Sequence, residues 1–432
     1  MTASLIAAFA VCVFAGSPSD FDVVWDSPSA DSSGSMPLGN GDVGVNVWME
    51  PNGDLLFYVS KTDAWDENGR LLKLGRVRVS LVPNLFVAGA RFRQSLNLEE
   101  GSVMIEAGAM AKLRVWVDAN RPVVRVEAKT LHPTSIRVAL ETWRTEKRAL
   151  GKEELDSAYG LMEAPHPVYV TPDVVFDDVD DAVVWRHRNE TSIWRESLEL
   201  QGMGTWAESA ADPLLHRTFG GMISGEGLVG KSAKELVSPV PRRMHQVSVY
   251  CLTTLGDEHG PARTNTDEAG VSKKHTSWKE QIEAIAEADQ ALSWRKASAG
   301  HRAWWKDFWE RSWIHVEGDS RAKTVSQGYA LQRYITAGAG RGAYPVKFNG
   351  SIFTVDAREG KSQFDADYRR WGGPYWFQNT RLVYWPLMAS GDTDMMPPLF
   401  RMYAEALPFA EARTQAYFGH EGAFFPETMV FW

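Results

Sequence analysis

Aromatic rings and polar side chains alternate closely in residues 364–386. The face of an aromatic ring can stack on the C–H face of a sugar ring, while carboxylates, amides and guanidinium groups hydrogen-bond to its hydroxyls. This combination is typical of a site that binds carbohydrate. The residues that we expect to bind a sugar substrate are Asp367, Trp371, Tyr375, Trp376, Arg381 and Trp385.

The same stretch contains a turn that determines where these rings lie. Gly372-Gly373-Pro374 disfavours a helix, whereas residues 378–387 have a helical pattern that Pro386 ends or kinks. We therefore expect the rings on a loop at the start of a helix. A tryptophan-rich core between packed helices is the plainer interpretation, but polar groups so closely interleaved with the rings favour a ligand site.

Residues 373–386 also resemble the core motif of glycoside hydrolase family 95, which contains inverting α-L-fucosidases and α-L-galactosidases. In that family a run ending in Asn-Tyr-Trp-Pro opens a helix of an (α/α)6 barrel. When the two runs are aligned on Tyr-Trp-Pro, Asn379 falls on the second catalytic-site asparagine of the family. The resemblance implies that Asn379 positions the general base or the attacking water, and the alternative is that Asn379 is the N-cap of the helix. Phe377 falls on the first asparagine and departs from the motif, because a phenyl ring cannot orient a water.

Three further segments carry the resemblance. Residues 36–44, Met-Pro-Leu-Gly-Asn-Gly-Asp-Val-Gly, resemble the opening of family 95 proteins, and we expect a glycine-rich turn that feeds the first strand pair. Residues 345–353 lie where the family has a loop facing the active site, which implies that Asn349 contacts substrate; a plain Asn-Gly turn is the alternative. The loop of residues 419–428 makes Glu427 a candidate catalytic acid, and the alternative is a carboxylate that stabilises a helix N-terminus.

Residues 21–255 have the pattern of β-strands. Apolar and polar residues alternate in residues 42–48, 76–82, 103–107, 112–117 and 123–128, and residues 55–59 form a short apolar run. Turn signals between these runs, in place of helices, predict a large antiparallel β-sandwich. Residues 63–68, Asp-Ala-Trp-Asp-Glu-Asn, fit no EF-hand spacing, so we expect a solvated loop there.

The remainder of the chain has a helical pattern. Residues 257–274 are polar and rich in turn formers, which indicates a linker, and residues 278–313 carry apolar residues at helical spacing. His301, within that second segment, is expected at a helix surface or interface. Further helices are expected over residues 321–339 and over a stretch that starts at Pro397-Pro398 and kinks at Pro408.

These segments predict a multidomain β plus α protein. We expect a signal peptide (residues 1–16), a β-sandwich (20–256), a linker with helices (257–315) and the start of an (α/α)6 six-hairpin barrel (316–432). Since such a barrel has twelve helices and only three or four follow the linker helices, we expect the N-terminal portion of a longer protein. The chain is also similar to proteins grouped as domain of unknown function 5703, within the six-hairpin glycosidase superfamily.

Composition limits the class of protein and its partners. The net charge of −9 argues against nucleic acid or an anionic membrane as a partner, and 44% hydrophobic residues indicate a globular protein. An apolar run over residues 3–16 predicts a cleaved signal peptide, and hence a secreted or periplasmic protein. Cys12 would leave with it, and Cys251, in a predicted strand, is expected to be a buried small hydrophobe. No disulfide, metal site or cofactor is therefore expected.

The leading hypothesis is a secreted, inverting glycoside hydrolase that acts on α-linked sugars of plant or host glycans. Its partner would be an oligosaccharide or polysaccharide, with no membrane contact once the signal peptide is cleaved. One alternative is a non-catalytic carbohydrate-binding protein that retains the aromatic cleft, and another is a purely structural sandwich. The oligomeric state and the sugar are left open.

Overall fold

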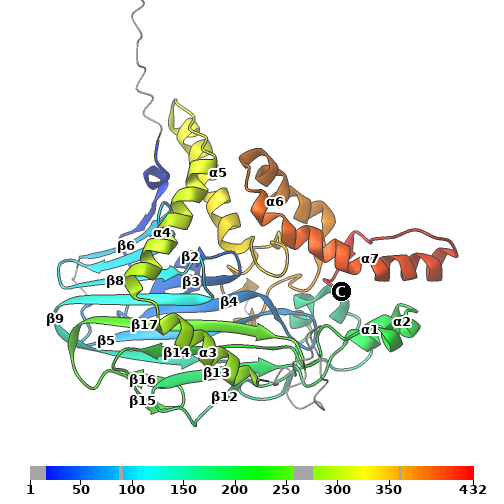
Figure 1. The fold of residues 1–432 in the computed structure, drawn as a ribbon, viewed down its shortest axis with the longest axis horizontal. Helices are drawn as coiled ribbons and strands as arrows, with labels where there is room; N and C mark the ends of the chain where they lie inside the picture. The colour runs from blue at the N-terminus through cyan, green and yellow to red at the C-terminus, as the bar shows by residue number, and fades with distance from the viewer. Residues whose placement is uncertain (1–15, 87–90, 257–275, 360–361) are drawn as a thin grey trace, which may run out of the picture.

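The computed structural model of this 432-residue chain describes residues 16–86, 91–256, 276–359 and 362–432. Almost all of the predicted signal peptide and the whole predicted linker of residues 257–274 lie outside these ranges. Among the described residues, strands come first along the chain and long helices follow (Figure 1). The large antiparallel β-structure that the alternation predicted is confirmed.

Fifteen strands form one antiparallel sheet with two arms that share strand β9. The first arm runs in the order β1 (Val23–Trp25), β6 (Phe92–Asn97), β7 (Ser102–Ala107), β8 (Ala111–Val117), β9 (Val123–Glu141), β17 (Arg242–Thr254), β14 (Thr218–Gly225), β13 (Ala182–Arg188) and β12 (Val174–Val175). The second arm contains β2 (Met36–Gly39), β3 (Val43–Met49), β4 (Leu55–Trp65) and β5 (Leu71–Val82), then β9, β16 (Glu235–Val237) and β15 (Val229–Ser232).

Strand β9 joins the arms because it is long enough to belong to both. Its first half pairs with β8 and β17, and its second half pairs with β5 and β16. Short strand pairs outside the sheet are β10 (Arg148–Ala149) with β11 (Tyr169–Val170), β18 (Arg358–Glu359) with β19 (Ser362–Gln363), and β20 (Tyr375–Trp376) with β21 (Thr428–Met429). The last of these pairs ties the end of the chain to the aromatic loop.

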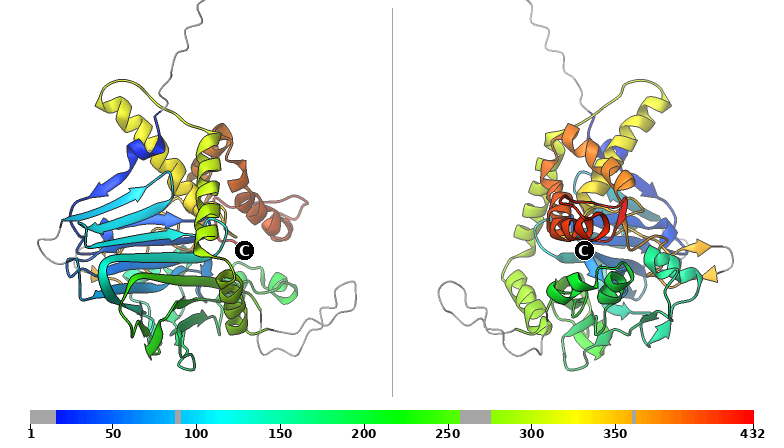
Figure 2. Two further views of the ribbon diagram at one scale, coloured as in Figure 1. Left: turned by 60° about the vertical axis from the view of Figure 1, so that its left-hand side comes forward. Right: turned by 90° about the vertical axis from the view of Figure 1, so that its right-hand side faces the viewer.

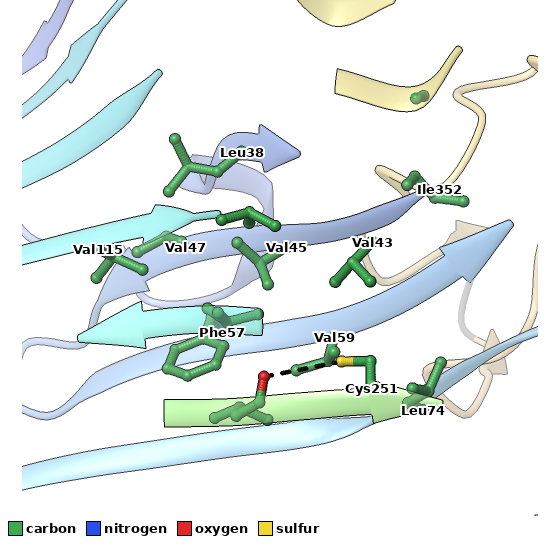
Figure 3. Packing of buried hydrophobic residues seen from close by; sticks show 14 of the residues in the cluster. Leu38, Val43, Val45, Val47, Phe57, Val59, Leu74, Val115, Cys251 and Ile352 are labelled. Atoms are coloured by element: carbon green, nitrogen blue, oxygen red, sulfur yellow. Dashed lines mark hydrogen bonds between the residues drawn. The ribbon is translucent and has the colours of Figure 1, made fainter. Parts of the chain in front are cut away.

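The main core lies between the two arms. Alternate residues of each strand point inward, as the period of two requires, and Figure 3 shows side chains from β3, β4, β5, β8 and β17 meeting there. Cys251 on β17 is part of this cluster, as predicted, and burial raises the pKa of its thiol to about 12. It packs as a small hydrophobe.

Seven α-helices are present in the described ranges. They are α1 (Trp194–Leu200), α2 (Gly204–Ser209), α3 (Trp278–Gln290), α4 (Trp294–Arg311), α5 (Ser320–Ala339), α6 (Phe377–Ser390) and α7 (Pro397–Phe418). Single 3-10 turns cover η1 (Pro18–Phe21), η2 (Ser32–Gly34), η3 (Glu153–Ser157), η4 (Tyr159–Leu161) and η5 (Thr393–Met395). None of the helices in the described part combines the length and the apolar content that a bilayer crossing requires.

Two of the expectations about helices need correction. Helices α1 and α2 interrupt the region read as strands, because Trp194 and Leu198 share one face at a spacing of four and are buried together. Of the two effects expected of Pro386, an end of the helix is wrong, because α6 continues to Ser390 with Tyr384 and Leu387 buried on its inner face. A kink at Pro386 stays a prediction.

The glycines of residues 36–44 allow the helical part to approach the sheet closely. The segment forms the hairpin β2–β3, as expected. A Cβ on Gly39 would lie 2.1 Å from the carbonyl oxygen of Gly338 at the end of α5, and one on Gly44 would meet Ile352 at 2.6 Å. Since neither contact is sterically possible, these glycines allow α5 and the loop of residues 345–353 to rest on the sheet (Figure 2).

Helix α4 covers one side of the sheet through a buried aromatic row. Trp305 and Phe308 are fully buried in the main core. His301 lies at this interface, as expected: its Nδ1 accepts from the backbone N–H of Ala119 at 3.2 Å and its Nε2 donates to the carbonyl of Glu100 at 2.7 Å. Burial lowers the pKa of His301 to about 3, so the ring is a neutral structural element.

Candidate functional site

The aromatic loop lies directly before a helix, as its Gly-Gly-Pro turn predicted. Strand β20 pairs with β21, and α6 begins at the next residue, Phe377. The two tryptophans Trp371 and Trp376 approach each other, with ring centroids 6.2 Å apart. Trp371 has a φ of 56°, in the left-handed region that non-glycine residues seldom occupy, and its side chain is 37% exposed.

One face of α6 carries a ridge of stacked groups, formed by Phe377, Arg381 and Trp385 and called the α6 ridge below. Their spacing of four places them above one another on the helix. The guanidinium of Arg381 lies 5.6 Å from the ring centroid of Phe377 and 5.3 Å from that of Trp385. Both rings are exposed, by 41% and 52%. The two exposed rings and the guanidinium between them together form a surface on which a sugar ring can stack.

Asn379 lies in the first turn of α6 and is exposed. The N-cap of this helix is Trp376, so Asn379 is not the cap. Its side chain makes no hydrogen bond to any residue in the described ranges. At about 100° per residue, it leaves the helix roughly 200° around from Phe377, so it does not share a face with the α6 ridge.

Asn349 holds the aromatic loop in its strained conformation. Its side-chain nitrogen donates to the carbonyls of Arg370 at 2.9 Å and Trp371 at 3.1 Å, and its side-chain oxygen accepts from Arg369 at 3.1 Å. Gly350, with a φ of 92°, completes the Asn-Gly turn that was the alternative interpretation. The amide is thus occupied by protein contacts, and a contact between Asn349 and substrate stays a prediction.

Tyr375 is buried, and its surroundings make it a support for the loop. Its hydroxyl donates to the carbonyl of Pro345 at 3.4 Å. The ammonium of Lys347 lies 4.2 Å from its ring centroid and donates to the carbonyls of Gly373 and Pro374. Burial lowers the pKa of Lys347 well below its ordinary value. Substrate binding by Tyr375 also stays a prediction.

Asp367 is buried under the loop and is fully occupied. It accepts hydrogen bonds from Arg144 at 2.6 Å, from the indole of Trp143 at 2.6 Å and from the backbone N–H of Lys73 at 3.0 Å. Burial alone raises the pKa of this carboxyl, but the charges of Arg144 and Arg70 outweigh it and hold the pKa below its ordinary value. Asp367 therefore anchors the loop to the sheet, and its binding of substrate is untested.

Arg144 continues this contact into a buried ion network. Arg144 also donates to Asp173 at 2.8 Å, and Asp173 accepts from Nδ1 of His187 at 3.1 Å. Nε2 of His187 donates to Glu67 at 3.0 Å. Burial lowers the pKa of His187, but the two carboxylates outweigh burial and raise it to about 9, so the imidazole is charged at neutral pH.

The position of Glu67 corrects an expectation. Residues 63–68 are not a solvated loop: Asp66, Glu67 and Asn68 are all buried. Asp66 pairs with Arg70 at 2.8 Å, and Glu67 is held by His187 and by Thr171 at 2.9 Å. Spacing showed only that this acidic run lacked a metal-binding pattern. Arg70 is a local partner, but His187, the cationic partner of Glu67, comes from a distant segment, which the local sequence does not reveal.

Glu427 adopts the arrangement that was the alternative interpretation. One carboxylate oxygen accepts from the backbone N–H of Gln378 at 2.8 Å, and its carbonyl accepts from the N–H of Phe377 at 2.9 Å. Both N–H groups lie in the first turn of α6 and have no partner within the helix. Glu427 thus stabilises the start of the helix that carries the α6 ridge. A role as catalytic acid remains a prediction.

A cleft of about 370 Å³ adjoins the loop between α1 and α7. Sequence reasoning did not identify it, because its walls come from six separate segments of the chain. The side chains that line it include Ile193, Gln201, Phe409, Arg413, Tyr417, Phe424 and Trp432. Phe409, Arg413 and Tyr417 are spaced by four residues on α7, and this spacing could have indicated that they share one face of the helix. Gly373 and Pro374 also line the cleft, but none of the nine predicted site residues does.

Comparisons with known proteins give one family. The sequence model of a family described as "Domain of unknown function (DUF5703)", for its N-terminal part, matches residues 24–314. No protein with a curated description matches the chain. Among solved structures, a bacterial glucoamylase complexed with acarbose is similar at a TM-score of 0.37 and 8% identity, over 95% of this chain and 55% of that one. The chain therefore spans about half the length of that glucoamylase.

Proposed function

The chain belongs to the DUF5703 family, whose model matches more than half of it, and from this premise we propose that it is part of a secreted glycoside hydrolase. Its substrates would be α-linked sugars of plant or host glycans, cleaved with inversion as in family 95. The observation that carries the proposal is the α6 ridge, together with the exposed Trp371 in the loop that precedes the helix. A sugar ring has apolar C–H faces, which stack on aromatic rings, and hydroxyls at its edge, which accept hydrogen bonds from a guanidinium.

The fold fits this proposal when helices α5, α6 and α7 are taken as the first helices of an (α/α)6 barrel. In that interpretation residues 20–256 are the sandwich domain, residues 257–315 the linker and residues 316–432 the incomplete barrel. Exposed apolar residues that lie off the α6 ridge, such as Leu382 on α6 and Phe400 on α7, would be covered by further helices in such a barrel.

Inversion needs a carboxylic acid that protonates the leaving oxygen and a carboxylate that activates water, roughly 6.5–9.5 Å apart. Glu427 is hydrogen-bonded to the start of α6, and Asp367 accepts from three donors. We propose that Glu427, which uses one carboxylate oxygen in this contact, is the acid, that another carboxylate is the base, and that Asn379 orients the base or the attacking water. An amide suits this role because it donates and accepts at once.

The occupied carboxylates also favour a second candidate function, that of a non-catalytic carbohydrate-binding protein. Such a protein would need the α6 ridge and Trp371 but no acid and base. The two functions share the binding surface and differ in turnover.

One pair of measurements separates them. Binding of a panel of α-linked oligosaccharides is measured by calorimetry, and turnover is measured with 4-nitrophenyl α-glycosides. Binding with turnover that Asn379→Ala abolishes, at unchanged melting temperature, supports the hydrolase. Binding without turnover by the present chain and by any longer form of it supports the binding protein. If no oligosaccharide binds, both functions are wrong.

A further inference from the structure

The outer face of the first sheet arm, away from the main core, changes character where helix α3 ends. Under α3 the face is apolar: Val184 on β13, Met222 on β14 and Tyr250 on β17 pack against Trp278 and Ile282. Beyond the end of the helix at Gln290 the same strands present polar residues. A helix that covers only part of a sheet face leaves the rest to water or to a ligand.

The uncovered part forms a groove, called the α3 groove below, with a volume of about 460 Å³. On its floor, Ser224 of β14 lies directly opposite Ser248 of β17, and Gln246 is the next outward residue of β17. The remaining side chains that line it are Asp181, Met222, Glu226, Leu228, Tyr250, Asp289, Gln290, Leu292 and Trp294. In each view of Figures 1 and 2, α3 lies apart from α6 and α7.

A buried polar cluster whose charges cancel lies behind the groove, which it reaches through Asp289 and Tyr250. Asp289 is only 4% exposed, and it accepts from Arg125 at 2.6 Å and from the Tyr250 hydroxyl at 3.3 Å. Arg125 also binds Asp118 at 3.1 Å, and Arg121 lies 3.7 Å from both carboxylates. Two carboxylates and two guanidinium groups leave no net charge, so the floor offers hydrogen bonds without attracting an ion.

Unused hydrogen-bonding groups surround this floor. The side-chain amides of Gln246 and Gln290 make no hydrogen bond within the part of the chain that the structure describes. Trp294 is half-buried at the edge, with the Arg125 guanidinium 5.0 Å from its ring centroid. Gly225 forms part of the rim, and a Cβ there would lie 2.6 Å from the carbonyl of Gln246.

The geometry points to a second carbohydrate site: we propose that the α3 groove binds sugar residues of a neutral oligosaccharide or polysaccharide. Amides, hydroxyls and a carboxylate complement sugar hydroxyls, and Trp294 supplies an apolar wall. Asp181 and Glu226 at the rim disfavour an anionic ligand. A bound metal is disfavoured because both oxygens of Asp289 already accept hydrogen bonds. This site is independent of the proposed function, since it requires no catalysis and no contact with the aromatic loop.

Binding of neutral gluco-, xylo-, manno- and galacto-oligosaccharides is measured by saturation-transfer NMR and calorimetry. The protein is the full chain with the substitution Trp385→Ala, which weakens any binding to the α6 ridge. We expect saturable binding that Gln246→Ala weakens at least tenfold. Gln290→Trp should abolish it by filling the groove from an exposed helix end. Gln327→Ala, on α5 and outside the groove, is the matched control and should bind like its parent.

The outcomes are distinct. Loss of binding in both groove variants, with melting temperatures within a few degrees of the parent and an unchanged control, supports the site. Absence of saturable binding to every neutral oligosaccharide overturns it. Equal affinity in Gln290→Trp and the parent also overturns it, as does binding of acidic oligosaccharides in preference to neutral ones. Because Trp385→Ala is present throughout, failure here leaves the proposal for the α6 ridge unaffected.

Discussion

Raising the pH should weaken the chain through His187, which joins the sheet to the ion network under the aromatic loop. Its pKa is raised to about 9 in the folded protein because two carboxylates bind the charged ring, against the effect of burial. In the unfolded chain the pKa is about 6.5. A folded-state pKa above the unfolded value means that the stabilisation is fully present below pH 6.5 and is lost as the pH rises through 9.

The size of the effect follows from these two values. A shift from about 6.5 to about 9 corresponds to on the order of 3 kcal/mol of unfolding free energy at low pH. Between pH 6.5 and 8 the expected loss is about 1.5 kcal/mol. Lys73 and Lys347 act in the opposite sense, because burial lowers the pKa of Lys73 to about 8 and that of Lys347 well below its ordinary value, so both contributions to stability rise with pH. The loss caused by His187 is therefore obtained as the difference between wild type and a variant that lacks this imidazole.

Urea denaturation at pH 6.5, 7.2 and 8.0 measures this loss. The unfolding free energy of wild type minus that of His187→Gln, which cannot titrate at this position, should fall by about 1.5 kcal/mol from pH 6.5 to 8.0. His301→Gln is the matched control: the pKa of His301 is lowered to about 3 by burial, so its titration affects stability below pH 6.5 only. An equal slope in wild type and in His187→Gln between pH 6.5 and 8 would refute the charged state assigned to His187.

Three substitutions test how the loop is held. Asp367→Asn should lower the unfolding free energy by about 3–5 kcal/mol in urea denaturation, because Arg144 loses a buried partner; a loss below about 1 kcal/mol would contradict its anchoring role. Glu427→Ala should cost about 1 kcal/mol by removing the acceptor for the Gln378 N–H, and Glu427→Gln, which keeps an oxygen, should cost less; equal melting temperatures for both would argue against this role. Asn349→Ala should speed hydrogen exchange in residues 369–373, and unchanged exchange would refute its support of that loop.

Local sequence rules predicted much of the architecture. Alternation of apolar residues identified β3, β5, β7 and β8, and the turn signals separated them. Helix α3 begins at a capping box in which Ser277 and Glu280 exchange hydrogen bonds, and α5 begins after Asp319, whose carboxylate caps it. These features could be predicted because period and capping act between residues close together in the chain.

What sequence reasoning missed depends on contacts between distant segments. The acidic run at residues 63–68 gave no sign that Glu67 would pair with His187. Residues 364–386 likewise gave no sign that Asp367 would pair with Arg144. The loop position of the aromatic rings was predicted from Gly-Gly-Pro, but burial divides the predicted site residues. Trp371 and Trp385 are exposed, whereas Tyr375 and Asp367 are enclosed. Residue type alone does not reveal which face of a loop is covered by another part of the chain.

The most direct measurement is the affinity of the α6 ridge for an α-linked oligosaccharide in two tryptophan variants. Trp385 is 52% exposed on α6, and Trp25, on β1, is 42% exposed and serves as the matched control. Trp385→Ala should weaken binding about fivefold in calorimetry, because one ring–sugar stack is worth roughly 1 kcal/mol. Trp25→Ala should leave binding unchanged. Equal affinities in Trp385→Ala and wild type would contradict the assignment of the α6 ridge as a carbohydrate site.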